Sequence, residues 1–229
     1  MVMKRIFLLT AVAVCATTLG ARAEKADSIS FYQNIQQVEV TATRAKADTP
    51  IAHSNLSRSE IEERNYGEDI PSLLANLPSV VISSESGTGI GSTSFRVRGT
   101  DPTRINVTLN GVPMNDAETH SVYWYDTPDL VSSLGSVQLQ RGVGTSTAGT
   151  GAFGASLNMT SAPLASKFSG RASLSYGSFN TAKQEIALSS GLLGGHWAIE
   201  GRLSHLSSDG YIERASSNLS SYMFQAGYY

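Results

Sequence analysis

The sequence predicts a small α+β domain, with a mixed sheet and short helices, followed by the first four or so antiparallel strands of a transmembrane β-barrel. Gly, Ser and Thr supply 72 of the 229 residues, a composition that favours strands and turns over a helical bundle. Residues 51–165 alternate between short helix and short strand patterns, whereas residues 166–229 carry strand patterns alone. Nine of the 18 aromatic residues lie in the last 62 positions, which indicates a change of environment there.

The first 23 residues have the pattern of an export signal. Lys4 and Arg5 precede an apolar stretch over residues 6–19 that is too short to span a bilayer, and residues 21–23 form an A-x-A cleavage site. A buried helix is the alternative interpretation of this stretch. Cleavage after residue 23 would remove Cys15, so we expect an exported protein without disulfides or cysteine-based zinc sites.

Residues 24–50 form a polar tail that contains one strand-like segment. Residues 37–43, Gln-Val-Glu-Val-Thr-Ala-Thr, alternate β-branched and polar side chains. An isolated extended segment has unpaired N–H and C=O groups along both sides, so a partner can add it to its own sheet as a strand. The pattern fits the first strand of the following domain equally well, and periodicity alone does not separate the two interpretations.

Residues 51–165 give specific helix and strand signals. Ser57 and Glu60 form a capping box at the start of one short helix, and Asp69 begins a second helix with Pro71 in its first turn. Strands are expected over residues 94–98, 105–109, 137–141 and 155–160, with Asn110-Gly111 as a two-residue hairpin turn. This mixture predicts the α+β domain.

Residues 166–229 predict four strands of a different kind. They lie at residues 171–176, 184–192, 197–203 and 221–229, each with apolar side chains on one face and charged or small polar ones on the other. The connection between the second and third strands, at residues 193–196, is a tight turn, and the connections before and after it are longer. Transmembrane barrels have this alternation, apolar outside and polar inside, and this alternation of short and long connections. Half of a soluble β-sandwich is the alternative, because its strands alternate as well.

Patterns for catalysis, metal binding or nucleic-acid binding are missing from the sequence. Residues 149–154 spell G-x-G-x-x-G, but a strand pattern follows them instead of the helix that a dinucleotide site needs. The four histidines lack metal-ligand spacing, and no G-x-S-x-G elbow occurs. A formal charge of −2 without a Lys/Arg run argues against a nucleic-acid interface. We therefore expect neither an enzyme nor an intrinsic cofactor or metal.

One group of charged residues could join the two regions. Arg96, Arg98 and Arg141 lie in or beside strands of a lightly charged domain. A buried arginine needs carboxylate or carbonyl partners, and Glu185 and Glu200 on the polar face of the last strands could provide them. Solvated arginines at strand edges are the alternative interpretation.

The loop at residues 115–125 is the second unusual group. It contains Asn115, Glu118 and His120 before three consecutive aromatic residues, Tyr123, Trp124 and Tyr125. Such a run is unusual on a solvated surface. It suits the contact point for a ligand, or equally a wedge that holds the loop in the core.

Four segments carry distinctive motifs: Asp-Ile-Pro-Ser-Leu-Leu-Ala-Asn-Leu-Pro-Ser-Val at 69–80, Phe-Arg-Val-Arg-Gly at 95–99, an Asn-Gly-Val-Pro hairpin within 107–116, and a Gly-rich stretch at 137–158. They resemble the plug helix, the R-G strand, the D/N-G-x-P hairpin and the closing plug signature of TonB-dependent outer-membrane transporters. The resemblance covers residues 36–229 and looks most like transporters of Bacteroidetes type, related to the ferric-citrate and siderophore group.

The resemblance implies a 22-stranded barrel filled by a plug. Val38, Glu39, Val40, Thr41 and Ala42 would form the TonB box, which pairs as a strand with the C-terminal domain of TonB in the periplasm. Arg96, Arg98 and Arg141 would hold the plug to Glu185 and Glu200 until TonB separates them. The ligand-facing residues would be Gly89, Gly91, Asn115, Glu118, His120, Tyr123, Trp124 and Tyr125, and the ligand an extracellular iron–siderophore or ferric-citrate complex.

The expected organisation is a signal peptide at 1–23, a periplasmic tail at 24–50, a plug at 51–165 and the start of a barrel in outer-membrane lipid at 166–229. Twenty-two strands of about ten residues need ~220 residues, so we expect a truncated transporter. The alternatives are an oligomeric barrel to which each protomer gives four strands, and a secreted ligand-binding module.

Overall fold

The computed structural model describes residues 44–46, 49–143 and 152–229, all within one unit of the chain, Ile35–Tyr229. The expected export signal and the segment Val38–Ala42 lie outside the described residues. The described strands form a five-stranded sheet, a two-stranded hairpin and a four-stranded sheet. The first two belong to what we call the N-terminal domain, and the third is the C-terminal sheet.

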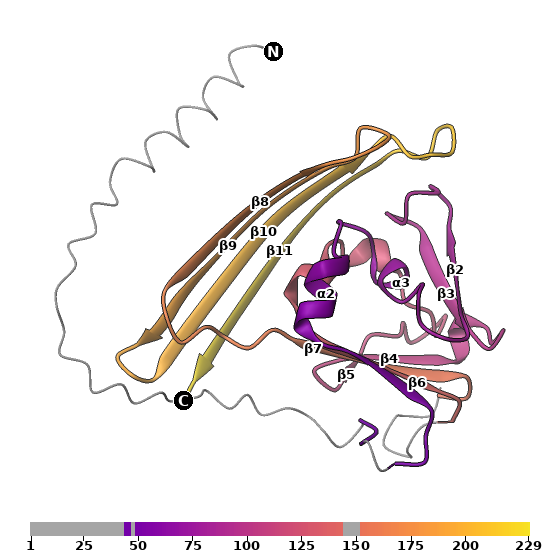
Figure 1. Cartoon of the computed structure of the whole chain (residues 1–229), viewed down its shortest axis with the longest axis horizontal. Helices are drawn as coiled ribbons and strands as arrows, with labels where there is room; N and C mark the ends of the chain where they lie inside the picture. The colour runs from indigo at the N-terminus through magenta and orange to yellow at the C-terminus, as the bar shows by residue number, and fades with distance from the viewer. Residues whose placement is uncertain (1–43, 47–48, 144–151) are drawn as a thin grey trace. The chain divides into compact units, whose positions relative to one another are not determined.

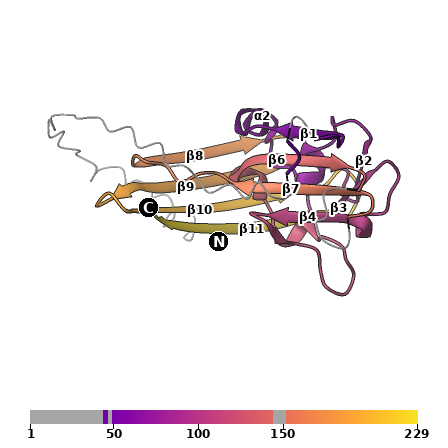
Figure 2. The same cartoon turned by 90° about the horizontal axis from the view of Figure 1, so that it is seen from below.

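A five-stranded mixed sheet organises the N-terminal domain (Figure 1). In spatial order its strands are β1 (His53–Leu56), β6 (Leu134–Arg141), β7 (Ala155–Ser161), β4 (Ile105–Leu109) and β5 (Val112–Pro113). The neighbours β4 and β7 run parallel and the other pairs run antiparallel, which confirms the predicted mixed sheet. The view from below shows β6, β7 and β4 side by side (Figure 2).

The predicted hairpin turn between β4 and β5 is confirmed. Asn110 and Gly111 have φ values of 52° and 81°, the left-handed conformation that a type I′ turn requires at both central positions. Asn110 is also tied to the end of β7, because its side-chain oxygen accepts from the Ser161 N–H at 2.9 Å. The turn therefore fixes the register of two strands.

Two short helices begin at the predicted caps. Helix α2 (Arg58–Arg64) follows Ser57, whose N–H and hydroxyl donate to Glu60 Oε2 at 2.8 and 2.7 Å. Helix α3 (Ile70–Leu73) follows Asp69 and is shorter than expected. Beyond it the N–H groups bond three residues back, so the segment continues as tightened turns instead of an α-helix.

The core of the N-terminal domain lies between one face of the five-stranded sheet and these helices. Val137 and Leu139 of β6 and Leu157 of β7 pack in it with Ile61 and Leu74. The opposite face of the same two strands is polar. Its side chains are Ser136, Gln138 and Gln140 from β6 and Ser156, Asn158 and Thr160 from β7.

A hairpin and several 3₁₀ turns complete the N-terminal domain. Strands β2 (Val80–Ser84) and β3 (Thr93–Val97) pair antiparallel, and β3 occupies the predicted position. The 3₁₀ turns are η2 (Pro102–Arg104), η3 (Trp124–Asp126) and η4 (Leu130–Ser133). The turn η4 leads directly into β6.

The C-terminal sheet contains four antiparallel strands in the order β11-β10-β9-β8. They are β8 (Ser169–Tyr176), β9 (Ala182–Leu193), β10 (Trp197–Ser208) and β11 (Ser217–Tyr228). The four predicted strands are confirmed, and each begins or ends beyond the range that the sequence pattern indicated; the extensions of β10 and β11 consist mainly of small polar residues.

The C-terminal sheet has the reverse polarity of a soluble sheet. Leu174 and Tyr222 are 83% and 84% exposed, whereas Lys183 and Arg202 are 4% and 6% exposed. The exposed apolar face also contains Tyr176, Ile186, Leu188, Trp197, Leu203, Phe224 and Tyr228. Large apolar patches of this kind mark a surface that another apolar phase covers. The polarity disfavours the soluble sandwich.

Among the described helices, none has both the length and the apolar character needed to cross a membrane.

Candidate functional site between the N-terminal domain and the C-terminal sheet

A buried ionic cluster joins the N-terminal domain to the polar face of the C-terminal sheet. Its centre is Asp129, whose side chain is 1% exposed. Lys183 Nζ of β9 lies 2.6 Å from Asp129 Oδ1, and Arg202 Nη1 of β10 lies 2.8 Å from Asp129 Oδ2. Each carboxylate oxygen thus has its own cation, and the two cations come from neighbouring strands.

Serine and asparagine side chains satisfy the remaining polar groups of the cluster. Ser132 Oγ donates to Asp129 Oδ1 at 2.6 Å and accepts from Lys183 Nζ at 2.7 Å. Ser133 Oγ accepts from Arg202 Nε at 2.7 Å, and Asn65 Nδ2 donates to Ser132 Oγ at 2.9 Å. Buried charges are tolerated when they are paired and fully hydrogen-bonded, and this cluster meets both conditions.

Glu185 balances the charge of the cluster. Its Oε2 lies 3.4 Å from Lys183 Nζ, and its Oε1 lies 2.7 Å from Arg171 Nη2 of β8. Arg171 also lies 3.7 Å from Glu62 of α2. The cluster therefore pairs three acids with three bases across the contact. Asp129, Lys183, Glu185 and Arg202 are its buried members, and removal of any of these four would leave a buried charge short of a partner.

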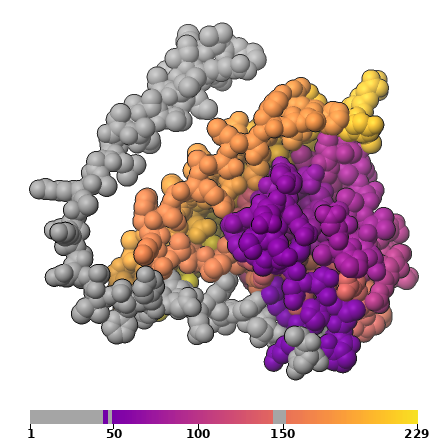
Figure 3. All heavy atoms as spheres, in the orientation of Figure 1, coloured from indigo at the N-terminus to yellow at the C-terminus, as the bar shows by residue number. Residues whose placement is uncertain are grey.

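The local backbone explains how these residues meet. Asp129 has φ 53°, a left-handed conformation that aspartate tolerates better than most residues, and it starts the turn η4. Lys183 and Glu185 lie two residues apart on β9 and so share one face. Arg202 is opposite Ala187 in the β9–β10 register, on that same face. The space-filling view shows the two regions in contact (Figure 3).

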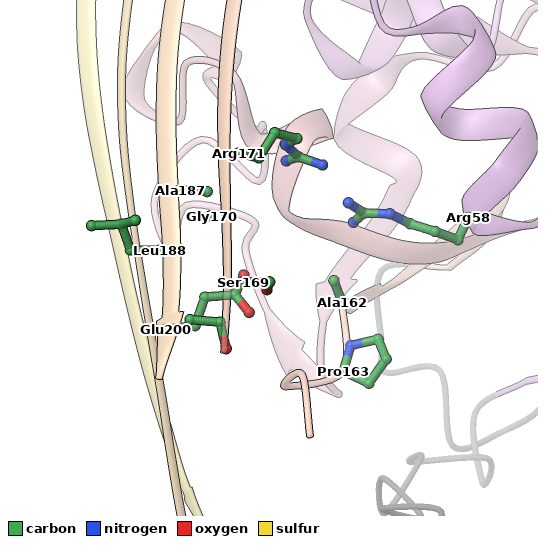
Figure 4. A pocket seen from close by; sticks show the side chains of 10 residues that line it. Arg58, Ala162, Pro163, Ser169, Gly170, Arg171, Ala187, Leu188 and Glu200 are labelled. Carbon is green, nitrogen blue, oxygen red and sulfur yellow. The ribbon is translucent and has the colours of Figure 1, made fainter. Parts of the chain in front are cut away.

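Two cavities flank the cluster. One of about 300 Å³ is lined by Arg58, Arg171 and Glu200, among others (Figure 4). Arg58 and Glu200 project into it from opposite sides. The other, of about 380 Å³, contains Lys183 and Glu185 in its lining. The contact therefore contains room for water beside the ionic cluster.

The structure corrects the pairing expected for the arginines. Arg96 Nη2 lies 3.9 Å from Asp101, and Arg141 Nη1 donates to Ser54 Oγ at 3.0 Å. Arg98 is exposed in the turn after β3, with φ 52°. In the described part of the chain these residues do not pair with the expected glutamates, because Arg96 and Arg98 point away from the core and Arg141 bonds across to β1.

The two expected glutamates do lie near the contact, with other partners. Glu185 belongs to the ionic cluster and lies 3.1 Å from Ser132 Oγ of the N-terminal domain. Glu200 lines the cavity with Arg58 and Arg171. The residues that the sequence analysis missed are Asp129, Lys183 and Arg202. The only sequence signal was the position of the two cations on a predicted polar strand face.

The loop between β2 and β3 contacts the connection between β10 and β11. Ser86 O accepts from the N–H groups of Tyr211 and Ile212 at 2.9 and 3.2 Å. A Cβ on Gly87 would lie 3.0 Å from Tyr211, and a Cβ on Gly91 would lie 2.9 Å from Ser217 Oγ. Glycine is therefore needed at this contact for space as well as for its positive φ.

Asp69 holds the same loop from the side of α3. Its N–H donates to Gly89 O at 2.8 Å, and its Oδ2 accepts from Thr93 Oγ1 at 3.0 Å. Burial raises the pKa of Asp69 to about 6, with smaller contributions from the carboxylates of Glu68 and Asp129. A cavity of about 570 Å³, lined in part by Gly89 and Glu68, opens beside the loop.

The aromatic loop divides into a buried and an exposed part. Trp124 is 3% exposed and packs on Phe95 with ring centroids 6.2 Å apart, so the expectation that it faces a ligand was wrong. Its position at the start of η3 directs it into the core. Tyr123 and Tyr125 are 39% and 44% exposed, and their ring centroids lie 5.7 Å apart.

The polar residues of that loop have mainly local contacts. Asn115 Nδ2 donates to the carbonyls of Ile105 and His120 at 2.9 Å, so it fixes the loop. Glu118 and His120 are exposed, and the Glu118 N–H donates to Asp116 at 3.1 Å. In the described ranges no group of three or more His, Cys, Asp or Glu side chains is placed to hold a metal ion.

Comparison with known proteins gives a family match and a set of similar folds. Residues 45–156 match the family model described as TonB-dependent Receptor Plug Domain. A search of curated proteins found no match. The solved structures include the pyoverdine outer membrane receptor FpvA from Pseudomonas aeruginosa, at 15% identity and a TM-score of 0.60 over 78% of this chain and 25% of that one.

Two further receptors show the same likeness. The alcaligin outer membrane receptor FauA from Bordetella pertussis is 21% identical, with a TM-score of 0.56 over 71% of this chain and 27% of that chain. The ferric yersiniabactin uptake receptor FyuA from Yersinia pestis is 17% identical, with a TM-score of 0.53 over 72% and 25%. The chain spans about a quarter of the length of these receptors, and the likeness at this identity is one of fold.

Proposed function

We propose that the chain is part of a TonB-dependent receptor, since the plug-domain model of that family matches residues 45–156, and that it acts in the active uptake of an iron chelate across the outer membrane. In this proposal residues 1–23 are the export signal, 24–50 the periplasmic tail, 51–165 the plug, and 166–229 the first strands of the barrel wall. The protein is a transporter component and not an enzyme.

The reverse polarity of the C-terminal sheet carries this proposal. An apolar face as exposed as that of Leu174 and Tyr222 suits acyl chains, and a face that buries Lys183, Glu185 and Arg202 suits a polar lumen. The lumen face contacts the plug through the ionic cluster. One sheet thus faces lipid on one side and the plug on the other.

The ionic cluster supplies a reversible attachment of the plug to the wall. It is electrically balanced and hydrogen-bonded, so it holds the plug in place at rest. Its cavities contain room for water, which can hydrate Asp129, Lys183 and Arg202 when the plug moves. A pull on the plug by TonB, docked as a strand on Val38–Ala42, would therefore exchange buried ion pairs for hydrated ones. Such a contact separates under force without unfolding the apolar core.

The ligand class rests on the receptors of similar fold, which are named for pyoverdine, alcaligin and ferric yersiniabactin. We place the ligand at the outer end of the plug, where the loop containing Gly89 and Gly91 meets the β10–β11 connection. Tyr123 and Tyr125 are the aromatic side chains of the plug loop that remain accessible to a chelate. Glu118 and His120 are exposed beside them.

A pull-down with the C-terminal domain of TonB tests the docking segment. Val40→Pro removes a ladder N–H donor, so it should abolish capture of the full chain. Ile29→Pro makes the same kind of change in the same tail but outside the segment, and it should leave capture unchanged. Equal capture of both variants would refute the docking assignment.

Iron transport is tested by uptake of radiolabelled iron into iron-starved cells that express the full-length receptor. Ferric citrate and a ferric tris-hydroxamate chelate are the two probes. Uptake of at least one that requires both the receptor and TonB supports the proposal. Equal uptake with and without the receptor for both probes would contradict the assigned ligand class.

A further inference from the structure

A cavity of about 570 Å³ lies between the loop that joins β2 to β3 and the connection between β8 and β9. Gly89 and Ile90 line it from the N-terminal domain, and Ser178 and Phe179 line it from the C-terminal sheet. It shares no described lining residue with the two cavities beside the ionic cluster. Its volume is within the range of about 300–1,000 Å³ that small-molecule sites have in proteins, so the cavity can hold part of a ligand.

The charged and aromatic residues of this cavity favour a positively charged group. Its described lining contains one carboxylate, that of Glu68, and two aromatic rings, those of Tyr66 and Phe179, while the other lining residues are neutral. Among the described residues that line it, none is Lys, Arg or His. The two cavities beside the ionic cluster differ in this respect, because both contain Arg58 and Arg171. The cavity therefore presents negative charge to a ligand.

Glu68 lacks a counter-ion among the described residues. Its side chain is half-buried, and in the part of the chain that the structure describes no cation lies within ion-pair distance of it. Burial raises the pKa of Glu68, since removal from water penalises the charged carboxylate. Lys183 passes close to Gly67, but its Nζ lies 2.6 Å from Asp129 Oδ1 and so belongs to the ionic cluster. A cation bound in the cavity would supply the missing charge.

Two aromatic rings complete the lining. Tyr66 is exposed, and Phe179 is half exposed and packs on Tyr211 with ring centroids 5.4 Å apart. The β10–β11 connection brings a second carboxylate close to Phe179, because the Asp209 N–H donates to Phe179 O at 2.9 Å. Aromatic faces attract cations through their quadrupole, so rings and carboxylates together suit an organic ammonium group.

A smaller cavity beside the same hairpin has the same chemistry. Its volume is about 220 Å³, and Glu85, Tyr123 and Tyr125 are in its lining. Again no Lys, Arg or His is among its described lining residues. Arg96 of β3 lies 3.9 Å from Asp101 and does not line the cavity. The preference for a cation thus extends over both cavities beside the hairpin.

We propose that the larger cavity, the Glu68 pocket, binds a protonated amine of the ligand, with Glu68 as its counter-ion and with Tyr66 and Phe179 as aromatic contacts. The proposal rests on the proposed function, because it narrows the iron chelate to one that carries an ammonium group. A chelate of net negative charge, such as ferric citrate, would face an uncompensated carboxylate in the same place and be repelled. The pocket therefore selects among chelates by charge.

A matched pair of chelates tests this preference. Ferrioxamine B is a linear ferric tris-hydroxamate with a free ammonium group, and its N-acetyl derivative has a neutral amide in the same place. Equilibrium binding of both, labelled with radioactive iron, is measured on the full-length receptor in detergent. A hydrogen-bonded ion pair in a partly buried site should make the Kd of the ammonium form about tenfold lower than that of the acetylated form.

Substitution of the counter-ion assigns the preference to Glu68. Glu68→Gln keeps the size of the side chain and should raise the Kd of the ammonium form about tenfold, to that of the acetylated form. The Kd of the acetylated form should not change, which shows that the variant receptor is folded. Glu63→Gln makes the same change at an exposed position of α2 outside the cavity lining and should keep the preference. Tyr66→Leu should reduce the preference about threefold, since a cation–π contact at an exposed ring is weaker than an ion pair.

The outcomes separate the pocket from the proposed function. Equal Kd values of the two chelates on the wild-type receptor, as expected if a cation of the receptor itself occupies the pocket, would overturn the proposal and leave iron uptake in place. A preference that survives in Glu68→Gln would overturn the assignment of Glu68 as the counter-ion. If neither chelate binds, the proposed ammonium ligand is wrong, and uptake of ferric citrate then decides whether the receptor transports iron at all.

Discussion

Replacing Asp129 by asparagine is expected to weaken the attachment of the N-terminal domain to the C-terminal sheet strongly. The amide keeps the size of the side chain but removes the charge that faces Lys183 at 2.6 Å and Arg202 at 2.8 Å. At these distances and an effective dielectric constant of ~20, each attraction is about 6 kcal/mol before desolvation is counted. Most of that gain offsets the cost of burying the ions.

The net effect follows from what remains after the substitution. Lys183 and Arg202 stay buried at 4% and 6% exposure, and Glu185 alone balances them. Removing one partner from a buried ion pair costs about 3–5 kcal/mol, because the remaining charge has lost its compensation. We therefore expect Asp129→Asn to lower the free energy of unfolding of the full chain by about 3–5 kcal/mol.

Tryptophan fluorescence during urea unfolding measures this loss. The chain contains two tryptophans, Trp124 in the plug core and the exposed Trp197 on β10. In a Trp197→Phe background, Trp124 is the tryptophan that remains and reports on the plug. It begins the turn η3, which ends at Asp126, three residues before Asp129. Asp126→Asn makes the same chemical change at an exposed position and should alter stability by no more than about 0.5 kcal/mol.

A double-substitution cycle decides whether the effect comes from charge imbalance. Lys183→Met combined with Asp129→Asn restores the balance, since one acid and one base are removed together. The pair should cost about 2 kcal/mol less than the sum of the two single changes. A cost below 1 kcal/mol for Asp129→Asn, or strict additivity of the pair, would refute the compensated cluster as the attachment.

Three further predictions concern Asp69, Gly87 and Trp124 of the N-terminal domain. Because the pKa of Asp69 is raised to about 6, the folded state binds its proton more tightly than the unfolded chain, so about 3 kcal/mol of stability present below pH 4 is lost as the pH rises through 6; Asp69→Asn should flatten that profile in urea melts. Gly87→Ala should cost about 1–3 kcal/mol more than Gly195→Ala, since both have positive φ but only the first would press a Cβ on the β10–β11 connection; equal losses would contradict that contact. Trp124→Ala should cost about 3–5 kcal/mol, against less than about 1 kcal/mol for Tyr125→Ala, because one ring is in the core and the other half exposed; thermal unfolding separates the two.

Features that depend on neighbouring residues were predictable from the sequence. The capping box at Ser57 and the type I′ turn at Asn110-Gly111 need only residues within three positions of each other, so their chemistry is visible in the sequence. The alternation over β8 to β11 was visible for the same reason, because successive side chains of a strand point to opposite faces. Strand β1, with four residues and no alternation, gave no such signal.

The ionic cluster was not predictable in its details because its members are far apart in sequence. Asp129 and Lys183 are 54 positions apart, and their meeting depends on where η4 packs against the sheet. Arg96 and Arg141 looked like candidates on composition, but the register of β3 and the end of β6 direct them elsewhere. Trp124 shows the same limit, since a run of three aromatic residues does not reveal which ring enters the core.

Strand β6 connects the edge of the five-stranded sheet to the ionic cluster. It begins at Leu134, directly after the serines that contact Lys183 and Arg202, and it pairs with β1 over Val137–Gln140. Because β1 is the first described strand after the tail, a pull on the tail would reach β1 first, and β6 would transmit the load to η4 and the cluster. Substitutions at the β1–β6 pair should therefore change the order of unfolding under load more than substitutions in β4 or β5.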